Sequence, residues 1–141
     1  MDDYEQIRQL TYKYAYAVDC KQVDLHTGLW TDDAVLDYTG LGLNRLAGFH
    51  QIRRYFEYVT TALASSSHLT SNHIITISSA DRASGTCYWR TEARTASGER
   101  TSSSGCYHDQ YARLDGNWRI AERVAVPLIP PELKDLRPAP L

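Results

Sequence analysis

The sequence predicts a single α+β domain in which three helices cover one face of a curved, mostly antiparallel sheet. Apolar residues recur at helical spacing in two segments of the first half, 4–21 and 48–63. After residue 68 they alternate at strand spacing instead. Helices followed by a run of strands are typical of α+β domains. The length of 141 residues suits one domain with its own core.

The first half of the chain contains the predicted helices. Residues 4–21 form an amphipathic helix, and a second short helix is expected over 23–30, before Asp32. Residues 34–38 alternate as a strand. After a glycine-containing loop, the third helix is expected over 48–63, where apolar residues again recur every three or four positions.

The pattern of alternating apolar residues in the second half of the chain predicts four antiparallel strands. They are expected over residues 68–77, 82–94, 100–113 and 118–126. Turn signals separate them, and the Asp115–Gly116 pair is typical of a tight hairpin. Pro127 is expected to end the last strand because proline has no backbone N–H for a ladder hydrogen bond. We therefore assign the domain to residues 1–127 and an extended, Pro-rich tail to 128–141.

Composition and charge exclude several classes of function. A net charge of −2 offers no basic surface for nucleic acid or for a membrane. The acidic N-terminus differs from a signal peptide, and no apolar run approaches the roughly 20 residues that span a bilayer, so we expect a cytoplasmic protein. Three separated cysteines, and no clustered metal-binding or Gly-rich phosphate-binding motif, predict neither disulfides, metal nor cofactor.

The aromatic composition is biased toward tyrosine, with ten tyrosines and two phenylalanines. A tyrosine ring packs as an apolar body, but its hydroxyl needs a hydrogen-bond partner when it is buried. This bias favours a cavity lined by rings that can hydrogen-bond a ligand. The alternative is that the tyrosines lie at the surface and at the edge of the core.

Several short motifs, in this order, resemble those of the SnoaL-like family within the nuclear transport factor 2-like superfamily. They are a helix that closes on Asp19, the Leu-Trp-Thr-Asp-Asp-Ala step at 29–34, the Gly-x-x-x-Ile-Arg start of a helix at 48–53, the His-x-x-x-Asn motif at 68–72 and the hairpin at 115–120. The resemblance covers nearly the whole chain. It implies a cone-shaped α+β barrel, with the helices on the concave face of the sheet, that forms a homodimer or homotrimer.

The resemblance also implies a site. In the dehydratases and dehydrochlorinases of this family, an Asp at the end of a helix orients a His on a strand, and the His removes a proton; Asp19 and His68 match these positions. Tyr38 and Tyr14 match pocket tyrosines. A neutral His is a suitable base near pH 7, and a carboxylate on one ring nitrogen leaves the other free. The other expected substrate contacts are Trp30, Phe56, Trp89, Tyr107 and His108.

Each of these residues also has a structural interpretation. Asp19 could cap its helix, and His68 could be a polar residue at the start of a strand. Tyr14 could simply pack in the core, because on an ideal helix, at roughly 100° per residue, it lies about 140° from Asp19. His108 is a second candidate for the base. Strict alternation places His73 on the opposite face of the sheet from His68.

The first functional hypothesis is a cofactor-independent lyase, a dehydratase that acts on a hydrophobic, oxygenated, cyclic molecule such as a polyketide, steroid or terpenoid intermediate. Isomerisation or cyclisation of the same class of substrate stays open, because each begins with the same proton abstraction. Two hypotheses come from other classes: a non-catalytic module that binds a small ligand, and a dimerisation domain whose tyrosines cover the open sheet face. The sequence does not identify the substrate.

Overall fold

The computed structural model of the chain describes residues 1–133 and 135–141. The helices are α1 (Asp3–Asp19), α2 (Val23–Thr27) and α3 (Phe49–Ala62), with a 3-10 turn at Thr39–Leu41. The strands are β1 (Trp30–Asp37), β2 (Arg45–Ala47), β3 (Leu63–Ile77), β4 (Arg82–Thr95), β5 (Arg100–Leu114) and β6 (Asn117–Glu132). None of the described helices is both long enough and apolar enough to cross a membrane.

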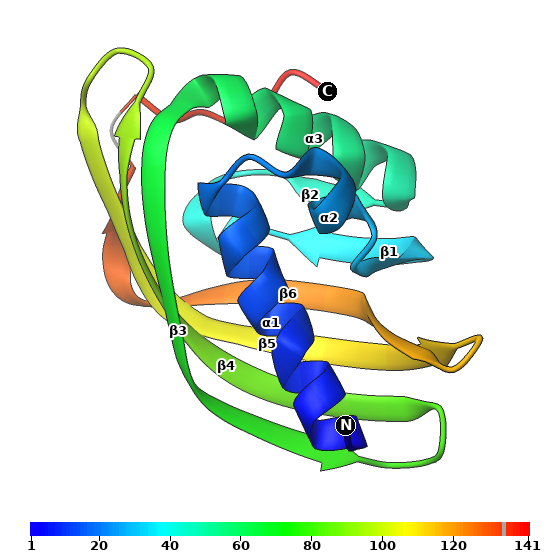
Figure 1. Cartoon of the computed structure of the whole chain (residues 1–141). Helices are drawn as coiled ribbons and strands as arrows, with labels where there is room; N and C mark the ends of the chain where they lie inside the picture. Colours follow the sequence, from blue (N-terminus) through cyan, green and yellow to red (C-terminus); the bar gives the residue numbers. More distant parts are fainter. Residues whose placement is uncertain (134) are drawn as a thin grey trace.

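The strands form one curved sheet, which confirms the predicted α+β class. In the described residues the strand order is β2-β1-β6-β5-β4-β3. Every neighbouring pair is antiparallel except β1 and β6, which run parallel. The long strands β3 to β6 bend around α1, and α2 and α3 lie over the end of the sheet formed by β1 and β2 (Figure 1).

Helix α1 crosses the concave face of the sheet and contacts β3 and β6 (Figure 1). Its first turn is capped by Asp2, whose side chain accepts a hydrogen bond from the backbone N–H of Glu5 at 2.8 Å. Ile7, Leu10 and Tyr14 are buried at the spacing of one helical face. This apolar face seals the hollow of the sheet, so the inner faces of the long strands become the core.

The boundary between the second helix and the first strand differs from the predicted one, and β3 begins at Leu63, five residues before the expected start at residue 68. The helix expected over 23–30 ends at Thr27, and Trp30 and Asp32 already belong to β1. Trp30 pairs with Ile120 of β6, so cross-strand hydrogen bonding extends β1 toward its N-terminus. The short strand β2 was not predicted, because three residues carry too little alternation to be distinguished from a loop.

The prediction that Pro127 ends the last strand was wrong. β6 continues to Glu132, and Pro127 pairs with Gly105 of β5. The parallel partner β1 pairs with β6 only as far as Val124. Beyond that residue, in the described part of the chain, no strand pairs with this edge of β6, and the 3-10 turn at Thr39–Leu41 packs there instead. At such an edge a proline can be accommodated without an unmade ladder hydrogen bond.

A bulge in β3 changes which side chains face inward. Asn72 has a φ of 52°, and the pairing with β4 shifts register between Ser71 and Ile74. As a result His73 lies on the same inner face as His68, where its Nε2 is 3.0 Å from the hydroxyl of Tyr111. The prediction that the two histidines face opposite sides was wrong, because strict alternation fails at an extra residue.

A buried ion pair joins the centres of β5 and β6. Asp109 and Arg123 are directly opposite in the strand pairing, and both side chains are fully buried. Arg123 donates from Nε and Nη2 to the two carboxylate oxygens at 2.9 and 2.8 Å. Its guanidinium lies 4.5 Å from the ring centre of Tyr14 and 4.1 Å from that of Tyr107. Burial disfavours the charge, but Asp109 outweighs it and holds the pKa of Arg123 above its ordinary value.

We expect Arg123→Met to lower the free energy of unfolding by about 3–5 kcal/mol, because it leaves the Asp109 carboxylate buried without its cation. The measurement is urea unfolding at pH 7, followed by circular dichroism. Arg100→Met is the matched control, because it removes an exposed ion pair with Glu92 and should cost no more than about 1 kcal/mol. Adding Asp109→Leu to Arg123→Met should restore part of the lost stability. If Arg123→Met and Arg100→Met lowered the free energy of unfolding by the same small amount, the stabilising role of the buried pair would be contradicted.

Candidate active site

The structure brings Asp19 and His68 into contact, although 49 positions separate them in the sequence. Asp19 is the last residue of α1, and His68 lies on the inner face of β3. The distance from Asp19 Oδ1 to His68 Nδ1 is 2.6 Å. The backbone N–H of His68 donates to Oδ2 at 2.8 Å, and the hydroxyl of Ser66 donates to Oδ1 at 2.8 Å. Three donors therefore fix the carboxylate.

The charge on Asp19 determines how the imidazole is oriented. Burial raises the pKa of Asp19, but the hydrogen bonds from His68 and Ser66 outweigh burial and hold this pKa below its ordinary value. An ionised carboxylate only accepts hydrogen bonds, so His68 Nδ1 carries a hydrogen, and in the neutral imidazole Nε2 then keeps a free electron pair. The negative end of the α1 dipole disfavours a carboxylate at this position, and the three donors compensate for that.

Tyr14 and Tyr38 form the second polar pair of the site. Tyr14 projects from the inner face of α1, Tyr38 follows β1, and their hydroxyls are hydrogen-bonded to each other. Burial raises the pKa of Tyr14 to about 12, with Arg123 opposing it, so its hydroxyl stays protonated at neutral pH. The mutual bond uses one of the two hydroxyl hydrogens. The other remains available to an oxygen atom of a ligand.

A cavity of about 120 Å³ opens between the helices and the sheet, next to His68. Its wall is mainly apolar and aromatic. Five of the ten tyrosines supply most of its aromatic rings. The ring-bearing lining residues are Tyr14, Tyr38, Tyr55, Tyr58 and Tyr107, together with His26, Phe56 and Trp89. The tyrosine-rich composition therefore does correspond to a cavity lined by aromatic rings that carry hydroxyls.

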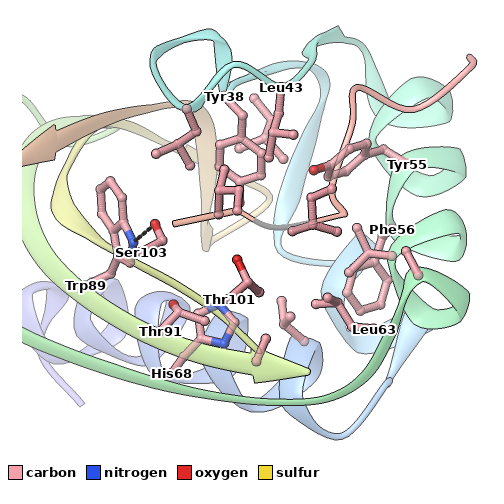
Figure 2. Close-up of a pocket in the computed structure, with 18 of the residues that line it drawn as sticks. Tyr38, Leu43, Tyr55, Phe56, Leu63, His68, Trp89, Thr91, Thr101 and Ser103 are labelled. Atoms are coloured by element: carbon pink, nitrogen blue, oxygen red, sulfur yellow. Dashed lines mark hydrogen bonds between the residues drawn. The ribbon is translucent and has the colours of Figure 1, made fainter. Parts of the chain in front are cut away.

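The polar part of the wall comes from the sheet. Figure 2 shows His68 close to Thr91 and Thr101, whereas Tyr55 and Phe56 approach from α3 on the other side. Ser103 accepts a hydrogen bond from Trp89 Nε1 at 2.9 Å. A ligand in the cavity thus meets hydroxyls, an imidazole and the rings of Trp89 and Tyr107 on the sheet side, and further aromatic rings on the helix side.

The C-terminal residues close part of the cavity wall. Leu133, Leu136 and Arg137 are lining residues. The segment is held by Asn44, whose side-chain amide donates to the carbonyl of Ala139 at 3.1 Å and accepts from its backbone N–H at 2.7 Å. The Pro-rich tail is therefore part of the site, and the boundary expected after residue 127 does not separate it from the cavity.

Two of the expected substrate contacts lie elsewhere. Trp30 is buried in the core, with its ring 6.2 Å from that of Tyr14, and it does not line the cavity. His108 is exposed, because Tyr107 and Asp109 on either side of it point inward. The interpretation of His108 as a pocket residue, and as the second candidate base, was therefore wrong. Phe56, Trp89 and Tyr107 do line the cavity.

Sequence reasoning missed two features of the site. His26, on α2, lines the cavity with its ring stacked on Phe56 at 4.0 Å between centroids; no motif marked it, because α2 has only five residues. The Asp109–Arg123 pair was also missed, although alternation from Tyr107 places Asp109 on the inner face. Among the described residues, no three His, Cys, Asp or Glu side chains gather as a metal site requires.

The SnoaL-like domain family matches residues 1–124, so the chain belongs to this family. A candidate aromatic ring hydroxylase from Novosphingobium aromaticivorans has 27% sequence identity and a TM-score of 0.87, with 92% of each chain covered. A candidate scytalone dehydratase from the same species has 18% identity and a TM-score of 0.85, with 99% of this chain and 94% of that chain covered.

A third solved structure, hexachlorocyclohexane dehydrochlorinase type 3 from Novosphingobium barchaimii, has 18% identity and a TM-score of 0.80, with 98% of this chain and 94% of that chain covered. No curated protein matches the chain in sequence. These likenesses establish the fold that the motifs predicted. The fold is shared by proteins with different described activities, so the activity has to be argued from the site.

We expect Asp19→Asn to lower the free energy of unfolding at pH 7 by about 1.5–3 kcal/mol, because a neutral amide cannot replace the charged acceptor of three hydrogen bonds. The pKa of Asp19 is lower in the folded than in the unfolded protein. The stabilisation is therefore complete above the unfolded pKa, about 3.9, and is lost as the pH falls through the folded pKa.

Urea unfolding at pH 7 and at about pH 3 measures this difference. The exposed Asp32 provides the control Asp32→Asn, which should change stability little at either pH. If the difference between wild type and Asp19→Asn grew on acidification, the lowered pKa would be refuted.

Proposed function

We propose that this member of the SnoaL-like family is a cofactor-independent lyase, a dehydratase that removes a proton from a hydrophobic, oxygenated, cyclic substrate with His68 as base and Asp19 as its orienting partner. The observation that carries the proposal is the 2.6 Å contact between His68 Nδ1 and Asp19 Oδ1 at the wall of an aromatic cavity. It supplies a base whose free nitrogen can face the ligand and whose protonated form is stabilised.

The proposed reaction begins at a C–H bond next to a carbonyl group. His68 Nε2 takes the proton, and the C–H electron pair forms the enolate. Tyr38, paired with Tyr14, donates a hydrogen bond to the oxygen on which negative charge develops. The enolate then collapses, a C=C bond forms and the β-hydroxyl leaves. His68 returns its proton to that oxygen, so water is released and the imidazole is neutral again.

The cavity supports a substrate at the small end of the proposed class of polyketide, steroid and terpenoid intermediates. A cavity of about 120 Å³ is of the order of one that holds a single aromatic ring, about 150 Å³. A one-ring molecule fits this volume, and a two-ring molecule extends partly beyond it. The aromatic lining favours a flat, apolar body.

The same abstraction serves an isomerase or a cyclase. If the substrate has no β-hydroxyl, the enolate can take its proton back at another carbon, which moves the double bond, or it can attack an electrophilic carbon of the same molecule. Dehydration is preferred because a base that receives the proton can also return it to the departing hydroxyl. The position of the leaving group on the substrate decides among these reactions.

Proton abstraction can be tested without the natural substrate. We expect the wild-type protein to accelerate exchange of deuterium from D₂O into the carbons next to the carbonyl of 2-tetralone, followed by NMR. His68→Ala should keep the circular dichroism spectrum and lower the exchange rate by roughly 10²–10⁴-fold, the usual contribution of a general base. His50→Ala, at an exposed histidine of α3, is the control.

Two results would count against the proposal. A His68→Ala variant with the wild-type exchange rate would exclude His68 as the base. If the wild-type protein gave no exchange although 2-tetralone raised its Tm, the chain would instead be a non-catalytic module that binds a small ligand.

We expect Tyr38→Phe to lower the maximal exchange rate with 2-tetralone by roughly 10²-fold, because a donor to the developing enolate oxygen is removed. KM should change much less than kcat, because the hydrogen bond strengthens as charge develops. Tyr88→Phe, on the exposed face of β4, is the control. A fall in affinity with an unchanged kcat would show that Tyr38 contributes only to binding.

A further inference from the structure

His26 is a polar residue in the cavity that the proton transfer at His68 does not use. Its ring stacks on Phe56 at 4.0 Å with an angle of 7° between the planes, and it lies 5.2 Å from Tyr14 and 5.8 Å from Trp30. The residue is only 2% exposed. Since Figure 2 places Phe56 across the cavity from His68, the stacked His26 belongs to the helix side of the wall.

Burial keeps the imidazole of His26 neutral. Burial, together with the nearby positive charge of Arg123, lowers the pKa of His26 to about 3. Tyr14, Trp30 and Phe56 supply the other rings around it, and none of them carries a charge at neutral pH. His26 is therefore unsuited to proton transfer near pH 7 and acts through hydrogen bonds.

The two ring nitrogens of His26 have different surroundings. Nδ1 is buried and has no hydrogen-bond partner among residues 1–133 and 135–141. Nε2 is not enclosed in this way, and the residue lines the cavity. An unpaired N–H is more costly to bury than an unpaired acceptor, which favours the tautomer with a bare Nδ1. Nε2 then carries the hydrogen and can donate it to a group in the cavity.

We propose that His26 is a specificity-determining residue whose Nε2–H donates to a second oxygen of the substrate, on the side of the ring away from His68. The proposal rests on the proposed function, because it concerns the same cavity. It narrows the substrate class to flat rings with oxygen at two separated positions: one oxygen meets the Tyr14–Tyr38 pair, and the other meets His26. The nearby charge of Arg123 also favours a partly negative atom at this position.

Two probes that differ only in the second oxygen test this inference by calorimetry, without turnover. We expect the wild-type protein to bind 2,6-dihydroxynaphthalene roughly fivefold more tightly than 2-naphthol, about the value of one neutral hydrogen bond. His26→Phe keeps a flat ring against Phe56 but removes the donor, so it should abolish this preference. His50→Phe, at an exposed histidine, should preserve it.

The inference is overturned if wild type shows no preference, if neither probe binds, or if His26→Phe keeps the fivefold ratio. A His26→Phe variant that weakens both probes equally would assign His26 to packing and also overturn it. This result does not depend on which residue is the base. If the proposed function is wrong, deuterium exchange continues in the His68→Ala variant, whereas the affinity ratio that tests His26 is measured without any reaction.

NMR of ¹⁵N-labelled histidine in the wild-type protein supplies a second test that does not depend on folding of a variant. We expect His26 to show the Nε2–H tautomer, with no titration between about pH 5 and 8. Its Nε2 signal should move on addition of 2,6-dihydroxynaphthalene and move much less with 2-naphthol. An Nδ1–H tautomer, or equal shifts with the two probes, would overturn the inference.

Discussion

The buried pair of Asp109 and Arg123 is the constraint on which the rest of the structure depends. Two full charges lie at the centre of the sheet and can be tolerated there only if they neutralise each other with good geometry. This requirement fixes the register of β5 against β6. Because the guanidinium also packs against the rings of Tyr14 and Tyr107, the pair fixes how α1 sits in the hollow of the sheet.

The site follows from the placement of α1. Five residues before its end, the helix holds Tyr14 over Arg123, which brings the Tyr14 hydroxyl to Tyr38. At its last residue it delivers Asp19 to His68 on β3. Tyr14 and Asp19 point in different directions from the helix, but this does not prevent a shared site, because Asp19 does not line the cavity itself. Tyr14 and Val18 line it from α1, and Asp19 acts on it through His68. The hydroxyl pair and the imidazole can therefore face the same ligand.

Periodicity predicted the fold well but placed individual side chains less reliably. The long helices and strands were predictable because their apolar faces are many residues long. His73 was misplaced because the bulge at Asn72 adds a residue that alternation cannot anticipate. The prediction for Pro127 was wrong because a proline is tolerated there only where no second strand pairs with β6, which is a property of the assembled sheet. By contrast, the outward position of His108 was predictable, because adjacent residues of a strand point to opposite faces and Tyr107 was already expected to face the cavity.

The Asp19–His68 contact was predictable only through the family resemblance, since no local pattern relates residues 49 positions apart. His26 had no such signal, and the structure shows why the two histidines differ. His68 faces an ionised carboxylate that can stabilise its protonated form, whereas His26 is enclosed by aromatic rings and faces the positive charge of Arg123. Environment alone thus separates a side chain suited to accept a proton from one suited only to hydrogen-bond. In the proposed function, one cavity combines proton abstraction by His68 with recognition of a second oxygen by His26.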